Sequence, residues 1–172
     1  MDNFTEYKTG LVKRLRELDI VLREPVQLKH GAVSKFYVDV KEAYGYPDAL
    51  NSICETLGEM IDDETTCVAA GGHGGLSPAT VLSQWYGWKL CMVRDEEKKH
   101  GKGGLLDGQI PTEDDVVALV DDVLTTGGSM VHMKNAIKPT GARVIGGYVV
   151  AKRADARLDF PVRHILTAEE LM

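Results

Sequence analysis

The most constraining stretch of this chain is an apolar run that ends in two adjacent acids and a glycine-rich turn. Residues 116–130 read VVALVDDVLTTGGSM, so five apolar residues precede Asp121 and Asp122. A short, continuous apolar run bounded by turn residues is typical of a strand that is buried on both faces of a parallel sheet. Residues 125–129 follow as a hydroxyl- and glycine-rich turn before an amphipathic helix. The stretch therefore predicts an interior strand that carries two carboxylates and a turn to one edge of a sheet.

Strand-like and helix-like segments alternate along the rest of the chain. The expected strands are 36–40, 67–70, 89–93, 143–151 and 162–166. The expected helices begin near residues 4, 47, 77, 129 and 167, with Ser77 and Ser129 as N-caps, Gly141 ending the fourth and Thr167 and Glu170 forming a capping box in the last. Residues 71–75 and 94–108 are the expected loops. This alternation predicts an α/β fold with a mostly parallel central sheet flanked by helices, whose ligands bind at the carboxyl ends of the strands.

Length and charge narrow the class of protein. A chain of 172 residues favours a single domain, and a net charge of −6 argues against general binding of nucleic acid. The sequence shows no signal peptide, and no apolar run approaches the ~20 residues of a membrane span. The three cysteines are far apart, so we expect buried free thiols rather than disulfides or a zinc site. These features predict a cytoplasmic protein without nucleic-acid or membrane partners.

The acids and the turn together indicate a site for a phosphorylated sugar. Adjacent carboxylates can accept hydrogen bonds from neighbouring sugar hydroxyls and can hold a hydrated magnesium ion. The glycines of residues 125–129 allow backbone N–H groups to approach an anion, and the following helix adds the partial positive charge of its N-terminus. The turn is not a Walker A loop, because the sequence has no GxxxxGK[ST].

Residues 116–130 resemble the phosphoribosyl-pyrophosphate (PRPP) motif of type I phosphoribosyltransferases, and are most similar to that of the orotate phosphoribosyltransferase family. Segments 28–44, 71–75 and 94–104 support this resemblance, which covers roughly residues 5–155. It implies the type I phosphoribosyltransferase fold, with a core of about 46–155 and a small hood made of about 1–45 and the C-terminal segment. It also implies transfer of the phosphoribosyl group from PRPP to orotate in pyrimidine biosynthesis, Mg²⁺ as cofactor, and a homodimer whose active sites are shared across the interface.

The resemblance also implies roles for individual residues. Lys98 and His100 would assist the departure of pyrophosphate, while Asp121 and Asp122 would hold the ribose and, through water, magnesium. The residues that would bind PRPP are Arg94, Lys98, Lys99, His100, Gly74, Gly75, Asp121, Asp122, Val123, Leu124, Thr125, Thr126, Gly127, Gly128 and Ser129. Those that would contact orotate are Lys29, Phe36, Tyr37, Thr125 and Arg153.

The sequence departs from the family pattern at two positions where a cation is usual. Asp95 stands where the residue after the loop arginine is usually lysine, and Gly74 stands where many relatives carry the lysine of Tyr-Lys-Gly. An acid at position 95 would weaken binding of pyrophosphate unless Lys99 or Lys102 compensates for it.

Two alternatives remain open. One is a purine phosphoribosyltransferase, although Thr125 stands where 6-oxopurine enzymes usually have an acid. The other is a non-catalytic regulator of the same fold that senses PRPP or a nucleotide. The presence of both Lys98 and His100 favours catalysis over regulation.

Overall fold

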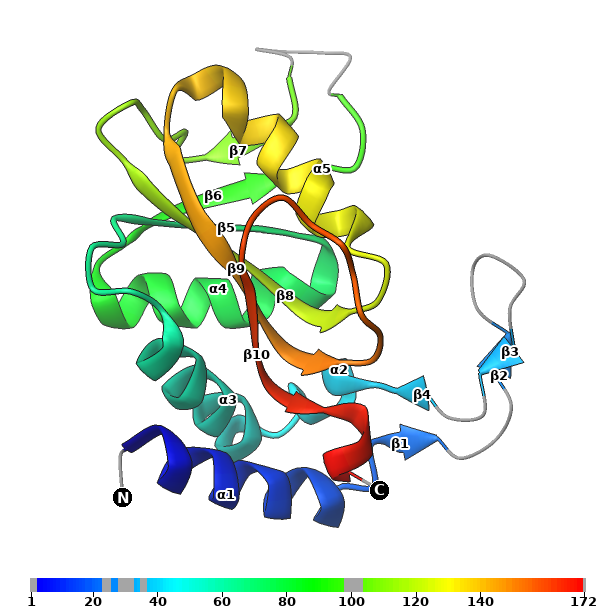
Figure 1. The fold of residues 1–172 in the computed structure, drawn as a ribbon. Helices are drawn as coiled ribbons and strands as arrows, with labels where there is room; N and C mark the ends of the chain where they lie inside the picture. The colour runs from blue at the N-terminus through cyan, green and yellow to red at the C-terminus, as the bar shows by residue number, and fades with distance from the viewer. Residues whose placement is uncertain (1–2, 23–25, 28–32, 35–36, 98–103, 172) are drawn as a thin grey trace.

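A six-stranded sheet forms the centre of the computed structural model, which describes residues 3–22, 26–27, 33–34, 37–97 and 104–171. The strand order is β10-β9-β8-β5-β6-β7. The strands are β5 (Cys67–Gly71), β6 (Lys89–Val93), β7 (Leu106–Gly108), β8 (Val116–Leu124), β9 (Arg143–Lys152) and β10 (Val162–Thr167). All neighbours are parallel except β6 and β7, which pair antiparallel. The predicted fold, a mostly parallel sheet flanked by helices, is confirmed (Figure 1).

Apolar side chains fill both faces of the sheet, because successive residues of a strand point to opposite faces. In β5, Val68 and Ala70 belong to one buried hydrophobic cluster, whereas Cys67 and Ala69 belong to the other. Strands of a sheet that is covered on both sides need apolar residues at every position. This explains why they read in the sequence as continuous apolar runs.

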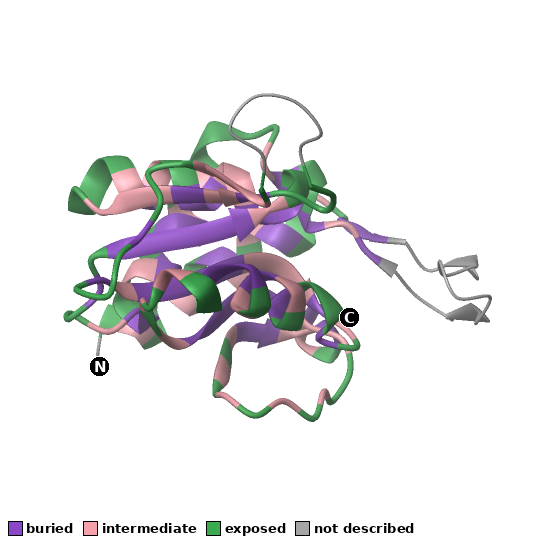
Figure 2. Cartoon of the chain, turned by 90° about the horizontal axis from the view of Figure 1, so that it is seen from above, coloured by how far each residue is buried: buried purple, intermediate pink, exposed green. Residues whose placement is uncertain are grey.

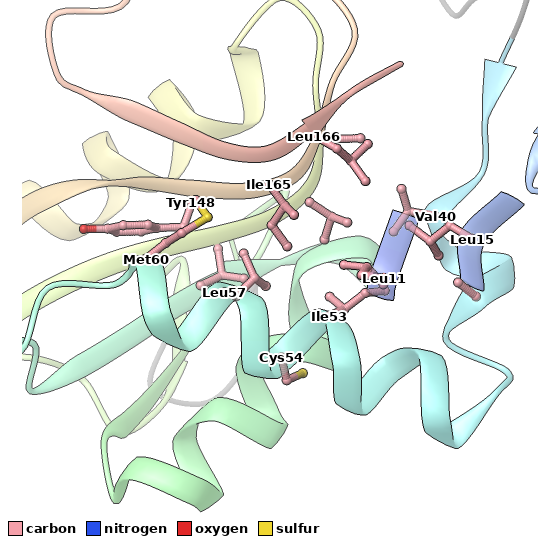
Figure 3. Packing of buried hydrophobic residues seen from close by; sticks show 14 of the residues in the cluster. Leu11, Leu15, Val40, Ile53, Cys54, Leu57, Met60, Tyr148, Ile165 and Leu166 are labelled. Carbon is pink, nitrogen blue, oxygen red and sulfur yellow. The ribbon is translucent and has the colours of Figure 1, made fainter. Parts of the chain in front are cut away.

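Helices cover the two faces unequally. Three of them, α1 (Asn3–Glu17), α3 (Pro47–Met60) and α4 (Gly72–Tyr86), contribute side chains to the first cluster. The helix α5 (Gly128–Ile137) contributes Met130 and Met133 to the second. Figure 3 shows Leu11 and Ile53 of the first cluster beside residues of the sheet such as Ile165.

The N-terminal segment adds two small antiparallel sheets beside the main one. β1 (Val21–Leu22) pairs with β4 (Tyr37–Val38), and β2 (Val26–Gln27) pairs with β3 (Val33–Ser34). Figure 1 shows β2 and β3 extending away from the central sheet. A short helix, α2 (Val40–Ala43), returns the chain to the core. The expected strand over 36–40 is therefore wrong at its end, where α2 already begins.

Four expected boundaries near the strand ends are also wrong. α4 begins at Gly72, so residues 71–75 are mostly its first turn and Ser77 lies inside the helix rather than at its N-cap. α5 is capped by Gly127 in the left-handed conformation (φ 82°) rather than by Ser129. β8 continues through Leu124, so both acids belong to the strand, because its pairing with β9 extends to that point. The last residues of the expected loop 94–108 form β7.

The expected ends of other helices agree with the structure. Gly141, with φ of 80°, follows a 3-10 turn, η1 (Lys138–Thr140), which continues α5. The backbone N–H of Thr167 donates to the carboxylate of Glu170 at 2.7 Å, which confirms the capping contact, although η2 (Ala168–Leu171) is a 3-10 helix.

Burial is concentrated in the sheet and the inner faces of the helices (Figure 2). The three cysteines are free and buried, as predicted. Among the described residues, no helix has the length and apolar character that crossing a membrane requires.

Candidate active site

The carboxyl ends of β5 and β8 lie side by side at one edge of the sheet. β5 pairs with β6 on one side and with β8 on the other, so the strand order changes direction here. Loops that leave neighbouring strands toward opposite sides open a crevice at such a point. Both acids and the predicted phosphate turn lie at this edge.

Asp121 and Asp122 do not form a single paired face, because successive residues of β8 point to opposite sides of the sheet. Each carboxylate accepts the backbone N–H of the residue that follows it, at 2.9 Å in both cases. Asp121 therefore borders the pocket of the phosphate turn, whereas Asp122 lies at the contact between β8 and α4.

Asp121 is the acid whose protonation is most strongly perturbed. Its burial, and then the charge of Asp122, raise the pKa of the Asp121 carboxyl to about 7. A cation bound nearby would favour the ionised form of this acid.

Asp122 is held by a lysine that the sequence analysis did not single out. The Nζ of Lys41, on α2, donates to Asp122 Oδ2 at 2.7 Å. Lys41 Nζ also lies 3.6 Å from Asp39 Oδ1. No local signal marks Lys41, because its partner lies 81 residues further along the chain.

Glycine at positions 74 and 75 is required by packing rather than by a loop conformation. A Cβ atom at Gly74 would lie 2.4 Å from the Asp122 carboxyl carbon, and one at Gly75 would lie 2.4 Å from the Val120 carbonyl oxygen. The Tyr44 hydroxyl donates to the Gly74 carbonyl at 2.8 Å. The first turn of α4 therefore lies directly against the end of β8, where a lysine in place of Gly74 would not fit without movement of Asp122.

The phosphate turn encloses a small pocket at the N-terminus of α5. Its volume is about 40 Å³, and its lining residues are Asp121, Val123, Leu124, Thr125, Thr126, Gly127, Gly128, Ser129 and Met130. The N-terminus of a helix offers backbone N–H donors and a partial positive charge to an anion. The structure thus brings together all of the residues that the sequence predicted for this turn. A larger hollow, of about 950 Å³, lies along α1, away from both acids.

Arg94 follows β6 and is paired in the structure. Its Nε donates to Asp107 at 2.5 Å, and its backbone N–H donates to the Leu105 carbonyl at 2.8 Å. The Nε2 of His132, on α5, donates to the Arg94 carbonyl at 2.7 Å. A pyrophosphate bound by the Arg94 side chain would therefore share the guanidinium with Asp107 or displace this acid.

The remaining predicted residues divide into two groups. The backbone N–H of Arg153 donates to the Leu124 carbonyl at 3.0 Å, which places this arginine next to the end of β8. Tyr37 lies on β4. The predicted residues that lie outside the described part of the chain are Lys29, Phe36, Lys98, Lys99 and His100.

The donor set fits a magnesium ion that is shared with a substrate. Magnesium commonly binds to proteins through one or two carboxylates and completes its shell with substrate phosphates and water. Asp121 and Asp122 supply two such carboxylates at the crevice. Among the described residues, no group of three or more acids, histidines or cysteines is arranged to hold a metal without further ligands.

No family model matches the chain. It is 32% identical over 157 residues to the orotate phosphoribosyltransferase of Methanothermobacter thermautotrophicus, covering 91% of this chain and 86% of that protein. It is 36% identical over 151 residues to that of Pyrococcus abyssi, covering 86% and 82%.

Solved structures agree with these sequence relatives. The crystal structure of orotate phosphoribosyltransferase from Aeropyrum pernix matches with a TM-score of 0.82 and 26% identity, covering 94% of this chain and 95% of that one. The Mycobacterium tuberculosis H37Rv orotate phosphoribosyltransferase in complex with PRPP shares the fold, with a TM-score of 0.77 and 24% identity, covering 96% and 98%. Together with sequence identity above 30% across most of both chains, these findings show that the chain belongs to the orotate phosphoribosyltransferase family.

Proposed function

We propose that this protein transfers the 5-phosphoribosyl group of PRPP to orotate, giving orotidine 5′-monophosphate and pyrophosphate in pyrimidine biosynthesis. The observation that carries the proposal is the meeting of Asp121, Asp122 and the phosphate turn at one edge of the sheet. A ribose with a 5′-phosphate and two hydroxyls matches these groups. Family membership supplies orotate as the acceptor.

The proposed reaction needs no covalent nucleophile on the protein. N1 of orotate forms a bond to the anomeric carbon of the ribose and gives its proton to solvent, while pyrophosphate leaves with the electron pair of the breaking C–O bond. Positive charge develops on the ribose, and negative charge on the leaving group. The protein must orient the two reactants and stabilise both charges.

Each part of the site has a role in this scheme. Asp121 and Asp122 accept hydrogen bonds from the ribose hydroxyls and lie near the cationic centre. Residues 125–129 hold the 5′-phosphate at the N-terminus of α5. Magnesium, when bound near the two acids, supplies charge neutralisation for the pyrophosphate.

The other substrate contacts in the proposal rest on the family resemblance. Arg153, beside the end of β8, faces the anionic orotate together with Lys29, and Phe36, Tyr37 and Thr125 flank the base. Arg94 and Lys99 bind the pyrophosphate, while Lys98 or His100 gives it a proton. We further propose that the chain is one domain with a hood and a core, acts in the cytoplasm, and forms a homodimer that shares its active sites.

A purine phosphoribosyltransferase is the second candidate. A structure of adenine phosphoribosyltransferase from Thermoanaerobacter pseudethanolicus shares the fold, with a TM-score of 0.71 and 17% identity. The base must therefore be identified by a direct comparison of acceptors.

The test mixes the purified protein with PRPP, Mg²⁺ and a single base, and follows pyrophosphate release together with the loss of ultraviolet absorbance by orotate. We expect turnover with orotate and none with adenine, hypoxanthine or uracil. Loss of one carboxylate that stabilises the transition state should lower kcat by about 10²-fold or more in Asp122→Asn. Turnover with a purine instead would refute the assignment of orotate, and PRPP binding without any turnover would favour a regulator.

A further inference from the structure

The short helix α2 is fixed to the active site by more than one contact. Val40 and Ala43 are fully buried and anchor the helix in the core. Immediately after it, the Tyr44 hydroxyl donates to the Gly74 carbonyl at 2.8 Å. The backbone that carries Lys41 is thus held between buried apolar contacts and the first turn of α4, so Lys41 extends from a fixed point.

The ion pair of Lys41 with Asp122 crosses from α2 to β8 at the crevice. The two charged atoms are 2.7 Å apart, and only 13% of the Asp122 side chain is exposed, against 40% of the Lys41 side chain. The carboxylate is therefore shielded, while the ammonium group can still move into solvent or toward a bound anion.

Both oxygens of Asp122 already accept a hydrogen bond. Oδ1 accepts the backbone N–H of Val123 at 2.9 Å, and Oδ2 accepts Lys41. The Lys41 ammonium thus occupies a position where a metal ion or a sugar hydroxyl would approach Oδ2. A ligand on that side must displace Lys41 or share the oxygen with it.

We propose that Lys41 is a positioning residue for the phosphoribosyl transfer proposed above: it fixes the orientation of the Asp122 carboxylate and fills a cation position on it in the ligand-free enzyme. Binding of PRPP and magnesium would displace the ammonium group from Oδ2, and the lysine would then lie close to the added negative charge. This role concerns Asp122 and its cation, so it does not depend on which base accepts the phosphoribosyl group.

A purely structural reading of the pair predicts different behaviour. An ion pair with an exposed partner contributes little to folding stability. If the pair had no other role, its loss would leave the protein folded, with metal binding and turnover unchanged. If Lys41 competes with a metal for Asp122, its removal should strengthen metal binding by the free enzyme. If Lys41 also orients Asp122, the same change should slow catalysis.

The experiment measures Mn²⁺ binding to the ligand-free protein by electron paramagnetic resonance, and then kcat and KM for PRPP. The variants are Lys41→Met, Lys41→Arg and the control Lys8→Met. The control removes a 2.8 Å ion pair between Lys8 of α1 and Glu170 of η2, which line the hollow along α1 and not the pocket of the phosphate turn. We expect Lys41→Met to bind Mn²⁺ about 10-fold more tightly, because a competing positive charge is lost. We expect its kcat to fall about 10-fold or more, because the carboxylate is no longer held in place.

Lys41→Arg keeps the charge and should bind Mn²⁺ like the unaltered enzyme. Lys8→Met should match the unaltered enzyme in both Mn²⁺ binding and turnover. Tighter Mn²⁺ binding combined with slower turnover in Lys41→Met supports the proposal. Unchanged Mn²⁺ binding in a folded Lys41→Met protein overturns it. If the unaltered protein shows no transfer to orotate, the proposed function fails, and the Mn²⁺ comparison still decides the role of Lys41.

Discussion

Substitution of Gly74 by alanine adds one methyl group at the closest contact between α4 and the active-site acids. The new Cβ atom would lie 2.4 Å from both Cγ and Oδ1 of Asp122, whereas ordinary van der Waals contact begins near 3.4 Å. Asp122 or the helix must therefore move by about 1 Å. The carboxylate cannot move that far and keep its contacts with Lys41 and the Val123 N–H.

The effects on stability and on activity should separate. Crowding in a packed site costs about 1–3 kcal/mol, but alanine is favoured over glycine inside a helix by about 1 kcal/mol, so the net loss of stability should be small. A misplacement of about 1 Å at a catalytic group can cost about 10²-fold in rate. We therefore expect Gly74→Ala to fold normally and to lose about 10²-fold in kcat/KM.

The assay is pyrophosphate release with PRPP and orotate, together with thermal unfolding of the same preparations. Gly10→Ala is the matched control, because Gly10 also lies inside a helix and an added Cβ there would meet no atom within 4 Å. The control should gain about 0.5–1 kcal/mol of stability with unchanged activity. Unchanged kcat/KM in Gly74→Ala would refute the argument that its packing fixes the position of Asp122.

Three further predictions concern other parts of the structure. Although burial opposes ionisation of Asp115, its lysine and threonine partners lower the pKa of its carboxyl to about 2. The ionised carboxylate therefore stabilises the fold above the unfolded-state pKa near 4, and this stabilisation is lost as the pH falls from there toward 2. We expect Asp115→Asn to lose about 2–4 kcal/mol of unfolding free energy, measured with urea at pH 7, and to show a weaker loss of stability in acid. Burial raises the pKa of Cys54 and Cys67 to about 12 and that of Cys91 to about 11, so a thiol reagent at pH 8 should modify none of them before unfolding, and rapid labelling of the native protein would contradict this. Gly127→Ala should weaken PRPP binding about 10-fold or more, measured by calorimetry, because φ is 82° and the added Cβ would lie 2.8 Å from a leucine side chain.

The strands of the central sheet could be predicted from the sequence, whereas the ends of some elements could not. Residues 116–120 are apolar at every position, and a short apolar run bounded by turn residues is typical of a strand covered on both faces. The continuation of β8 through Asp121 to Leu124 depends on its pairing with β9, which the local sequence does not encode. Likewise, α4 begins within a run of glycines, residues that intrinsic propensity places outside helices.

Some residues of the candidate site could likewise be predicted from the sequence, and others could not. The turn of residues 125–129 was predictable, because its hydroxyls and glycines are adjacent in the chain and their chemistry is local. The contact of Lys41 with Asp122 was not predictable, because only the packing of α2 against the core brings these distant residues together. The need for glycine at position 74 also becomes visible only once Asp122 is placed beside it.

The antiparallel pairing of β6 with β7 fixes both ends of the segment between these strands, so this segment can change with little effect on the sheet. The hydrogen bond from the Arg94 N–H to the Leu105 carbonyl joins the two ends of this segment at 2.8 Å. Because the entropy of closing a chain between fixed points grows slowly, doubling the length of such a segment costs only about 0.6 kcal/mol. By this entropy alone, insertions between these two residues should cost little folding stability. Asp95, within this segment, is exposed, so a change of charge there can alter the proposed pyrophosphate contacts at little cost in folding stability.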